Sequence, residues 1–286
     1  MSPAVGYALL SLLFAGCIDI TYKLYSKQAR SRGMFVCGMG VTWLIIQLGL
    51  FLIAGKSPVF NEATVLWGLL AGIVLTASNI LLVECLTHMD VSVGSTIYRL
   101  NTIGVVILSF LILSEPLGVF KISGILFGII AVLLLYQRGT DQIPTFPLIF
   151  LLLAIAASVF RALYGVLSKI GLKSGGDMDS MSLIFPLCWI IGGFLYAALR
   201  EKRVRMTFDK AKYCASGGVL AFLIVYTLMS AIEIGDVSIL IPIANLGFVI
   251  ALSYSIVTGM EKFSARKGFA ITCAGLSIFL LAQAGT

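Results

Sequence analysis

Four ionisable side chains lie inside long apolar stretches of the sequence: Asp19, Glu84, Arg99 and Arg161. A charged side chain in a bilayer costs about 2.5–3.5 kcal/mol on insertion scales, so it usually faces a partner charge or a polar cavity. A guanidinium presents a planar fork of donors that matches a carboxylate or a phosphate. A desolvated carboxylate can take up and release protons. These four residues are therefore the first candidates for a polar site inside the protein.

Arg99 is the strongest of the four candidates. It lies eight residues into the apolar stretch 91–113, which is about 12 Å deep at 1.5 Å per residue of helix. Tyr98 and Asn101 adjoin it in the sequence. We predict that Arg99, with Tyr98 and Asn101, binds an anionic ligand. The alternative is a structural ion pair with Glu84, because the short turn at 88–90 would bring the two helices side by side.

The elements that position these residues are membrane-spanning helices. The chain of 286 residues is 59% hydrophobic and only 12% charged, whereas soluble domains carry about 25% charged residues. Continuous apolar runs of helical length favour helices over barrel strands, which alternate. Ten spans of suitable length can be placed near 4–25, 34–54, 65–87, 91–113, 119–136, 147–169, 182–199, 214–234, 237–258 and 265–283. The predicted fold class is an all-α membrane protein of ten transmembrane helices.

The sequence is internally duplicated at an offset of 146 residues. Asp90-Val91-Ser92 matches Asp236-Val237-Ser238, Glu115 matches Glu261, and Arg99 falls on Asn245. This predicts a first five-helix repeat over 1–138, a linker over 139–146 and a second five-helix repeat over 147–286. Five is odd, so the second repeat must be inverted in the membrane. A substrate site is then expected near the midplane, between the two repeats.

The duplication adds further residues to the predicted site. Trp43 falls on Trp189, and aromatic walls suit a partly apolar ligand, although packing is the competing role for both. Asp19 falls on Arg161 at an offset of 142, which suggests that both face one axis. Asp19 or Glu84 could couple transport to protons, whereas a static pair of Asp19 with Arg161 or with Lys23 is the alternative. The predicted substrate-binding residues are Arg99, Tyr98, Asn101, Asn245, Arg161, Trp43 and Trp189.

The chain resembles the ten-helix members of the drug/metabolite transporter superfamily that carry two EamA-type domains. The resembling residues are Ser114-Glu115-Pro116-Leu117 followed by Gly124, and Gly259-Met260-Glu261-Lys262-Phe263 followed by Gly268 and Gly275. The second copy departs from the pattern, because its first glycine comes seven residues after the glutamate and not nine. We expect each glutamate to stabilise the N-terminus of the helix that follows it.

Basic residues predict the orientation in the membrane. Loops after odd-numbered helices hold thirteen Lys and Arg, and loops after even-numbered helices hold four. The positive-inside rule then places both termini on the non-cytoplasmic side of a bacterial inner membrane. The positive charge is therefore attributed to topology and not to nucleic-acid binding. The six single cysteines show no metal spacing, and phosphate-loop, nucleophile-elbow and metalloprotease motifs are missing.

These observations predict a secondary transporter, not an enzyme, without cofactor or metal, as a monomer or homodimer. It would move a small polar metabolite with a carboxylate or phosphate, such as an amino acid, by alternating access, in the direction of export. One alternative is an organic-cation or drug transporter that uses Asp19 and Glu84. Another is a membrane-embedded enzyme that acts on lipid-linked phosphate groups, for which Glu84 is the one candidate base near Arg99.

Overall fold

The computed structural model describes residues 2–26, 31–86, 97–134, 148–258 and 263–285, and within these ranges its regular structure is entirely helical. The helices are α1 Pro3–Ser26, α2 Arg32–Ala54, α3 Glu62–Leu86, α5 Asn101–Leu113, α6 Val119–Leu134, α7 Leu148–Lys173, α8 Met178–Tyr196 with a π-helical extension Ala197–Glu201, α9 Phe208–Ile234, α10 Val237–Asn245, α11 Phe248–Val257 and α12 Ala265–Ala284. In the described ranges, eight helical segments are long and apolar enough to cross a membrane, and Ile97–Leu113 and Val119–Leu134 are shorter apolar helices. The predicted all-α fold with ten membrane helices is confirmed. The predicted linker 139–146 and the turn around Glu261 lie outside the described residues.

The fourth and ninth spans, predicted as continuous, are each interrupted. In the fourth span, Leu100 (ψ 0°) separates helical residues 97–99 from α5. In the ninth, Leu246 (ψ 7°) separates α10 from α11. At both places hydrogen bonds from residue i to i−3 replace the α-helical pattern, as in Leu100 N–H to Ile97 O and Leu246 N–H to Ile243 O. Leu100 and Leu246 are 146 residues apart, so both repeats break their fourth helix at the same position.

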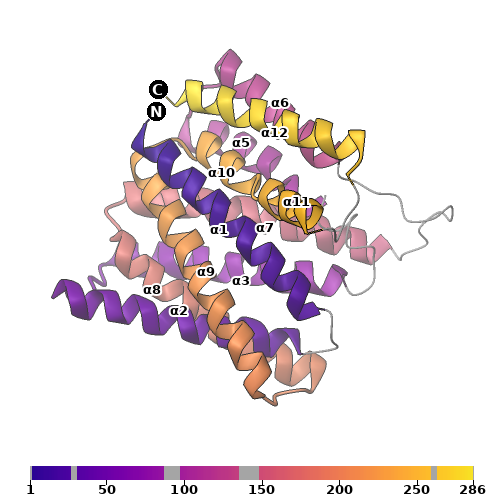
Figure 1. Ribbon diagram of the computed structural model, residues 1–286. Helices are drawn as coiled ribbons and strands as arrows, with labels where there is room; N and C mark the ends of the chain where they lie inside the picture. Colours follow the sequence, from indigo (N-terminus) through magenta and orange to yellow (C-terminus); the bar gives the residue numbers. More distant parts are fainter. Residues whose placement is uncertain (1, 27–30, 87–96, 135–147, 259–262, 286) are drawn as a thin grey trace.

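The helices pack in pairs that the duplication relates to one another (Figure 1). α2 packs on α8 and α6 on α12, and in each of these pairs a helix meets its own copy. α5 packs on α10, so the second part of the fourth span meets the first part of the ninth. α1 packs on α9 and α3 on α7, and exchanging the two halves converts one of these pairs into the other. This is the packing expected of two related halves. The boundaries of the two repeats stay a prediction.

The outer surface is apolar and the helix contacts are close. Ile45, Leu52 and Ile53 of α2 are 64%, 83% and 86% exposed, as suits side chains that face lipid. Inside, Gly33 of α2 lies against the backbone of Gly193 in α8, where a side chain would collide. Gly124 and Gly128 of α6 likewise allow close helix approach, because they lie against Leu281 and Ser277 of α12.

Both chain termini lie at the same end of the helix bundle (Figure 1). At this end, Gly235 packs against Ala4 and Gly285 against Val5. We call it the terminal end. α1 runs from Pro3 at the terminal end to Ser26 at the opposite end, so the two ends can be told apart within the described residues.

Candidate substrate site at the two helix breaks

Arg99 lies at the break of the fourth span and bonds to both halves of the chain. Its Nη2 donates to Oδ2 of Asp19 in α1 at 2.6 Å, which forms an ion pair. Its Nη1 donates to the backbone oxygen of Asn245, the last residue of α10, at 3.1 Å. The guanidinium also lies over the ring of Phe248, 5.3 Å from its centroid, which is cation–π range. The predicted anion-binding residue is thus held by an acid, a helix C-terminus and an aromatic ring.

Amide side chains join the two breaks directly. Nδ2 of Asn245 donates to Oδ1 of Asn101 at 2.7 Å and to Oγ1 of Thr102 at 3.1 Å. Nδ2 of Asn101 donates to the backbone oxygen of Tyr98 at 2.8 Å, an oxygen beside the interruption of the helix. Asn245 is the repeat copy of Arg99, so the same position of the two halves meets at this point. The network supplies hydrogen-bond partners in a region where lipid offers none.

The ion pair is only partly buried, and little space adjoins it. The side chain of Arg99 is 23% exposed and that of Asp19 is 32% exposed. A small cavity beside Arg99 is lined by Thr102, Pro242 and Ser277 among others, and its volume is about 10 Å³. This is room for about one water molecule. A metabolite therefore requires the helices around the breaks to move apart.

Glu84 lies elsewhere and does not pair with Arg99. Its carboxylate accepts from Nε and Nη2 of Arg200 at 3.1 and 2.8 Å, and from the hydroxyl of Tyr196. The expected pairing of Arg99 with Glu84 is therefore wrong for this conformation. The reason is that the C-terminal part of α3 packs on α8, whose π-helical extension brings Arg200 into reach.

Arg161 belongs to the neighbourhood of the site but forms no ion pair with a described acid. Its guanidinium lies over the ring of Tyr164, 5.3 Å from the centroid. The expected Asp19–Arg161 pair is not formed, because Asp19 is engaged by Arg99. The Lys23 side chain, the other expected partner of Asp19, lies outside the described residues. Tyr22, one turn after Asp19 in α1, lies within electrostatic range of Asp19, Tyr98 and Arg161.

Trp43 and Trp189 pack against each other between α2 and α8. Their ring centroids are 5.6 Å apart and the planes meet at 81°, an edge-to-face contact. Both are buried, with 0% and 5% exposed, and neither Nε1 has a hydrogen-bond partner in the described structure. This contact fits the packing role, and the substrate-binding role stays a prediction.

Two residues near the Asp19–Arg99 ion pair, Tyr22 and Phe248, were not selected from the sequence. Tyr22 carried a usable signal, because Tyr22 and Tyr164 match each other at the offset of 142. Phe248 carried none, since it is one of eighteen phenylalanines in an apolar chain. Among the described residues, no group of three or more His, Cys, Asp or Glu side chains could hold a metal ion.

Comparisons with known proteins agree with this architecture. Residues 2–137 match the model of the EamA-like transporter family. No curated protein matches the chain. A solved structure described as "Crystal structure of protein" superposes with a TM-score of 0.85 at 17% sequence identity, over 100% of this chain and 98% of that one. At this identity the likeness concerns the fold alone. Through residues 2–137 the chain belongs to the EamA-like transporter family of the drug/metabolite transporter superfamily, and it is a membrane transporter of that type.

Proposed function

We propose that the protein is a secondary transporter that moves a small polar metabolite bearing a carboxylate or phosphate by alternating access. One observation carries this proposal: a partly exposed guanidinium, paired with Asp19, sits where the broken helices of both halves meet. Broken helices near the midplane, with exposed backbone groups and charged side chains, are how several transporter folds build substrate sites.

The chemistry of the Asp19–Arg99 pair favours a substrate that carries a negative group. A carboxylate or phosphate of the substrate would replace Asp19 on the fork of Arg99 and keep the contact of the guanidinium with Phe248. An ammonium group on the same substrate would find the released carboxylate of Asp19. An amino acid supplies both groups, so we place amino acids first among the candidate substrates.

The same exchange offers a route to proton coupling. When a substrate without an ammonium group takes Arg99, Asp19 loses its partner and can bind a proton, which is released when the ion pair reforms. We therefore propose Asp19 as the coupling residue. Glu84 is a weaker candidate, because Arg200 and Tyr196 already hold its carboxylate.

The two alternatives each lose support from the position of Glu84. An organic-cation site would need Glu84 beside Asp19, and a lipid-phosphate enzyme would need it as a base beside Arg99. In the structure Glu84 pairs with Arg200 at the junction of α3 and α8. The cation site therefore retains Asp19 without Glu84, and the enzyme retains Arg99 without Glu84.

Reconstituted protein tests this function. Purified protein would first be screened by thermal shift against amino acids, dicarboxylates, sugar phosphates and organic amines, and the ligands found would be assayed as labelled substrates in proteoliposomes. The proposal expects chemically unchanged substrate to accumulate inside the vesicles, with flux lost in Arg99→Ala. Product formation from the substrate, or equal flux of organic amines in Arg99→Ala and wild type, would contradict it.

We also propose export as the direction, and the non-cytoplasmic side for both termini. A cysteine introduced at Arg203, in the basic segment after α8, should react with an impermeant maleimide from the cytoplasmic side only. Labelling of intact cells from outside at this position would reverse the topology.

A further inference from the structure

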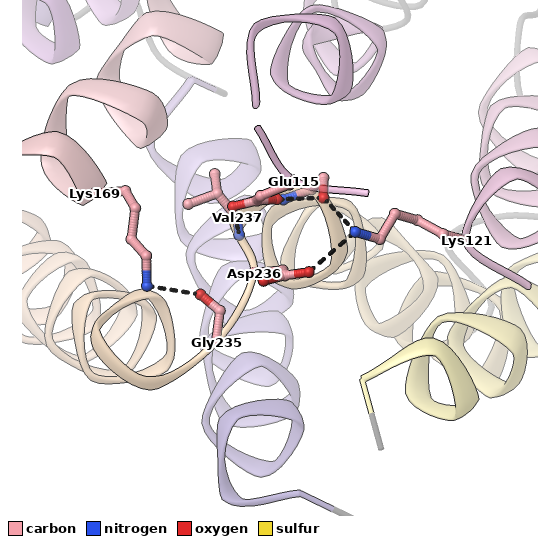
Figure 2. Close-up of polar contacts among 7 residues, drawn as sticks. Glu115, Lys121, Lys169, Gly235, Asp236 and Val237 are labelled. Atoms are coloured by element: carbon pink, nitrogen blue, oxygen red, sulfur yellow. Dashed lines mark hydrogen bonds and ion pairs between the residues drawn. The ribbon is translucent and has the colours of Figure 1, made fainter. Parts of the chain in front are cut away.

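A second set of charged and polar residues lies at the terminal end, and we call it the Glu115 cluster: Glu115, Lys121, Lys169, Asp236 and Ser238 (Figure 2). All of them are buried except Asp236, whose side chain is 42% exposed. Glu115 follows α5, and its carboxylate accepts the N–H groups of Val237 and Ser238, each at 2.9 Å, and the hydroxyl of Ser238. It therefore caps the N-terminus of α10. The expected capping role is found, but on α10 of the other half and not on α6, the helix that follows Glu115 in the sequence.

Two lysines complete the cluster from opposite sides, as Figure 2 shows. Nζ of Lys121 donates to Oδ2 of Asp236 at 3.1 Å and to Oγ of Ser238 at 3.0 Å. Nζ of Lys169 donates to the backbone oxygen of Gly235 at 3.0 Å and also to carbonyl groups in the last turn of α9. Cations are favourable at a helix C-terminus. Lys169 thus neutralises the partial negative charge at the C-terminus of α9, and Glu115 neutralises the partial positive charge at the N-terminus of α10.

The cluster fastens one half of the chain to the other. Glu115 lies in the α5–α6 turn and Lys121 in the first turn of α6, both in the first half, whereas Asp236 and Ser238 lie at the start of α10 in the second. α10 then runs from this cluster to Asn245, whose backbone oxygen accepts from Arg99. One short helix therefore connects the Glu115 cluster to the candidate substrate site.

The duplication retains the residue types of this cluster in both halves. At the offset of 146 residues, Glu115, Lys121 and Asp236-Val237-Ser238 correspond to the identical residues Glu261, Lys267 and Asp90-Val91-Ser92. Elsewhere the two halves have diverged widely, as at Arg99 and Asn245 or at Glu84 and Ser230. Five residues are therefore identical in the two halves: Glu115, Lys121, Asp236, Val237 and Ser238. Their identity indicates that they act together.

We infer that the Glu115 cluster is the latch that closes the terminal end of the transport path. Its bonds must break before the Arg99 site can open to that side. This inference rests on the proposed alternating access. The bonds of Glu115 converge on a single helix start, so loss of the carboxylate removes the cap that ties α10 to the α5–α6 turn and leaves the bonds of Lys121 to Asp236 and Ser238.

The experiment measures the separation of the α5–α6 turn and the α9–α10 turn by double electron–electron resonance. Spin labels are placed at Leu117 and Ile234, which are 39% and 55% exposed, in a variant with the six cysteines replaced. We expect Glu115→Gln to shift the distance distribution to longer values by several ångströms. Ser238→Ala, which removes one hydroxyl, should shift it in the same direction by less, and it decides the test if Glu115→Gln does not fold.

Two matched variants control for general loosening. Glu201 accepts two backbone N–H groups and the hydroxyl of Ser31 at the opposite end, so Glu201→Gln removes the same kind of cap away from the latch. Ser78→Ala removes a buried serine hydroxyl that donates to a backbone oxygen between α3 and α7. Neither should lengthen the 117–234 distance. An unchanged distance in folded Glu115→Gln, or in folded Ser238→Ala where Glu115→Gln does not fold, overturns the latch, and so does equal lengthening in the control variants.

Transport assays on the same variants separate this inference from the proposed function. Substrate flux in the wild type with no effect of Glu115→Gln on the distance removes the latch and leaves the transporter. A clear opening in Glu115→Gln, with no flux of any screened substrate in the wild type, supports the latch as a moving contact and counts against the proposed substrate class.

Discussion

Arg99 and Glu115 both bond the first half of the chain to the α10 helix of the second half, at its two opposite ends. Arg99 meets the C-terminal end of α10 through one backbone oxygen, and its side chain is 23% exposed. Glu115 meets the N-terminal end through two N–H groups and a hydroxyl, and it is 5% exposed. A charge with few bonds and partial exposure can exchange partners, whereas a buried charge with every acceptor used holds its position. The comparison assigns binding to one end of α10 and closure to the other.

The largest expected effect is on stability at the Glu115 end. Glu115→Ala leaves the buried N–H groups of Val237 and Ser238 and the Ser238 hydroxyl without their acceptor, so we expect the free energy of unfolding to fall by roughly 3–5 kcal/mol. Thermal unfolding in detergent measures this change. Glu233→Ala, at an exposed neighbouring acid, serves as the control and should change stability by less than about 0.5 kcal/mol. Similar losses in both variants would remove the contrast between the two ends.

The largest functional effect is expected at the Arg99 end. Arg99→Ala should lower substrate flux roughly 100-fold, because a charged contact with the substrate is lost. The protein should remain folded, since Asp19 is partly exposed and can be solvated. Flux assays in proteoliposomes and size-exclusion profiles check the two parts. Wild-type flux in this variant would show that the guanidinium does not contact the substrate.

A smaller, qualitative effect distinguishes the two acids inside the spans. Asp19→Asn should abolish the dependence of flux on a pH gradient while substrate exchange continues, because the coupling carboxylate is lost. Glu84→Gln should leave that dependence unchanged, since Glu84 is held by Arg200 away from the breaks. Both variants are assayed with an imposed pH gradient. Loss of coupling in Glu84→Gln alone would transfer the coupling role to that residue.

The smallest expected effect concerns the amide network between the breaks. Asn245→Ala removes two side-chain hydrogen bonds to Asn101 and Thr102. Two neutral bonds contribute about 2 kcal/mol net, so we expect substrate affinity to fall by no more than roughly 30-fold. Isothermal titration of the substrate identified in the screen measures this change. A loss as large as that in Arg99→Ala would mean that the network, and not the charge, carries the binding.

Composition and periodicity predicted the architecture well because they report on the membrane. Apolar runs of about 20 residues specify spanning helices, and the offset of 146 residues indicated that the chain consists of two related halves. The breaks were not predicted, because the span around Leu100 has no proline and its glycines, Gly94 and Gly104, are not adjacent to Leu100. Only Pro242 and Gly247 hinted at the second break. Broken helices depend on hydrogen-bond partners from other helices, which a local pattern does not encode.

The sequence also did not predict the interaction partners of Arg99 and Glu115, which lie on distant helices. Arg99 was identified from its depth in an apolar run, but its partner is Asp19 of α1 and not Glu84 of the neighbouring span. Glu115 was identified as a helix cap, but it caps a helix 122 residues away. In both cases the residue type predicted the kind of interaction, an ion pair or a helix cap. The partner of that interaction depends on the three-dimensional packing of the helices.

The central claim is that the guanidinium fork of Arg99 grips the negative group of the substrate. Titration of the identified substrate into Arg99→Lys and Arg161→Lys tests it most directly, because both changes keep the charge and remove the fork. The account predicts at least a roughly tenfold loss of affinity in Arg99→Lys and wild-type affinity in Arg161→Lys. Unchanged binding in Arg99→Lys, or a larger loss in Arg161→Lys, would contradict it.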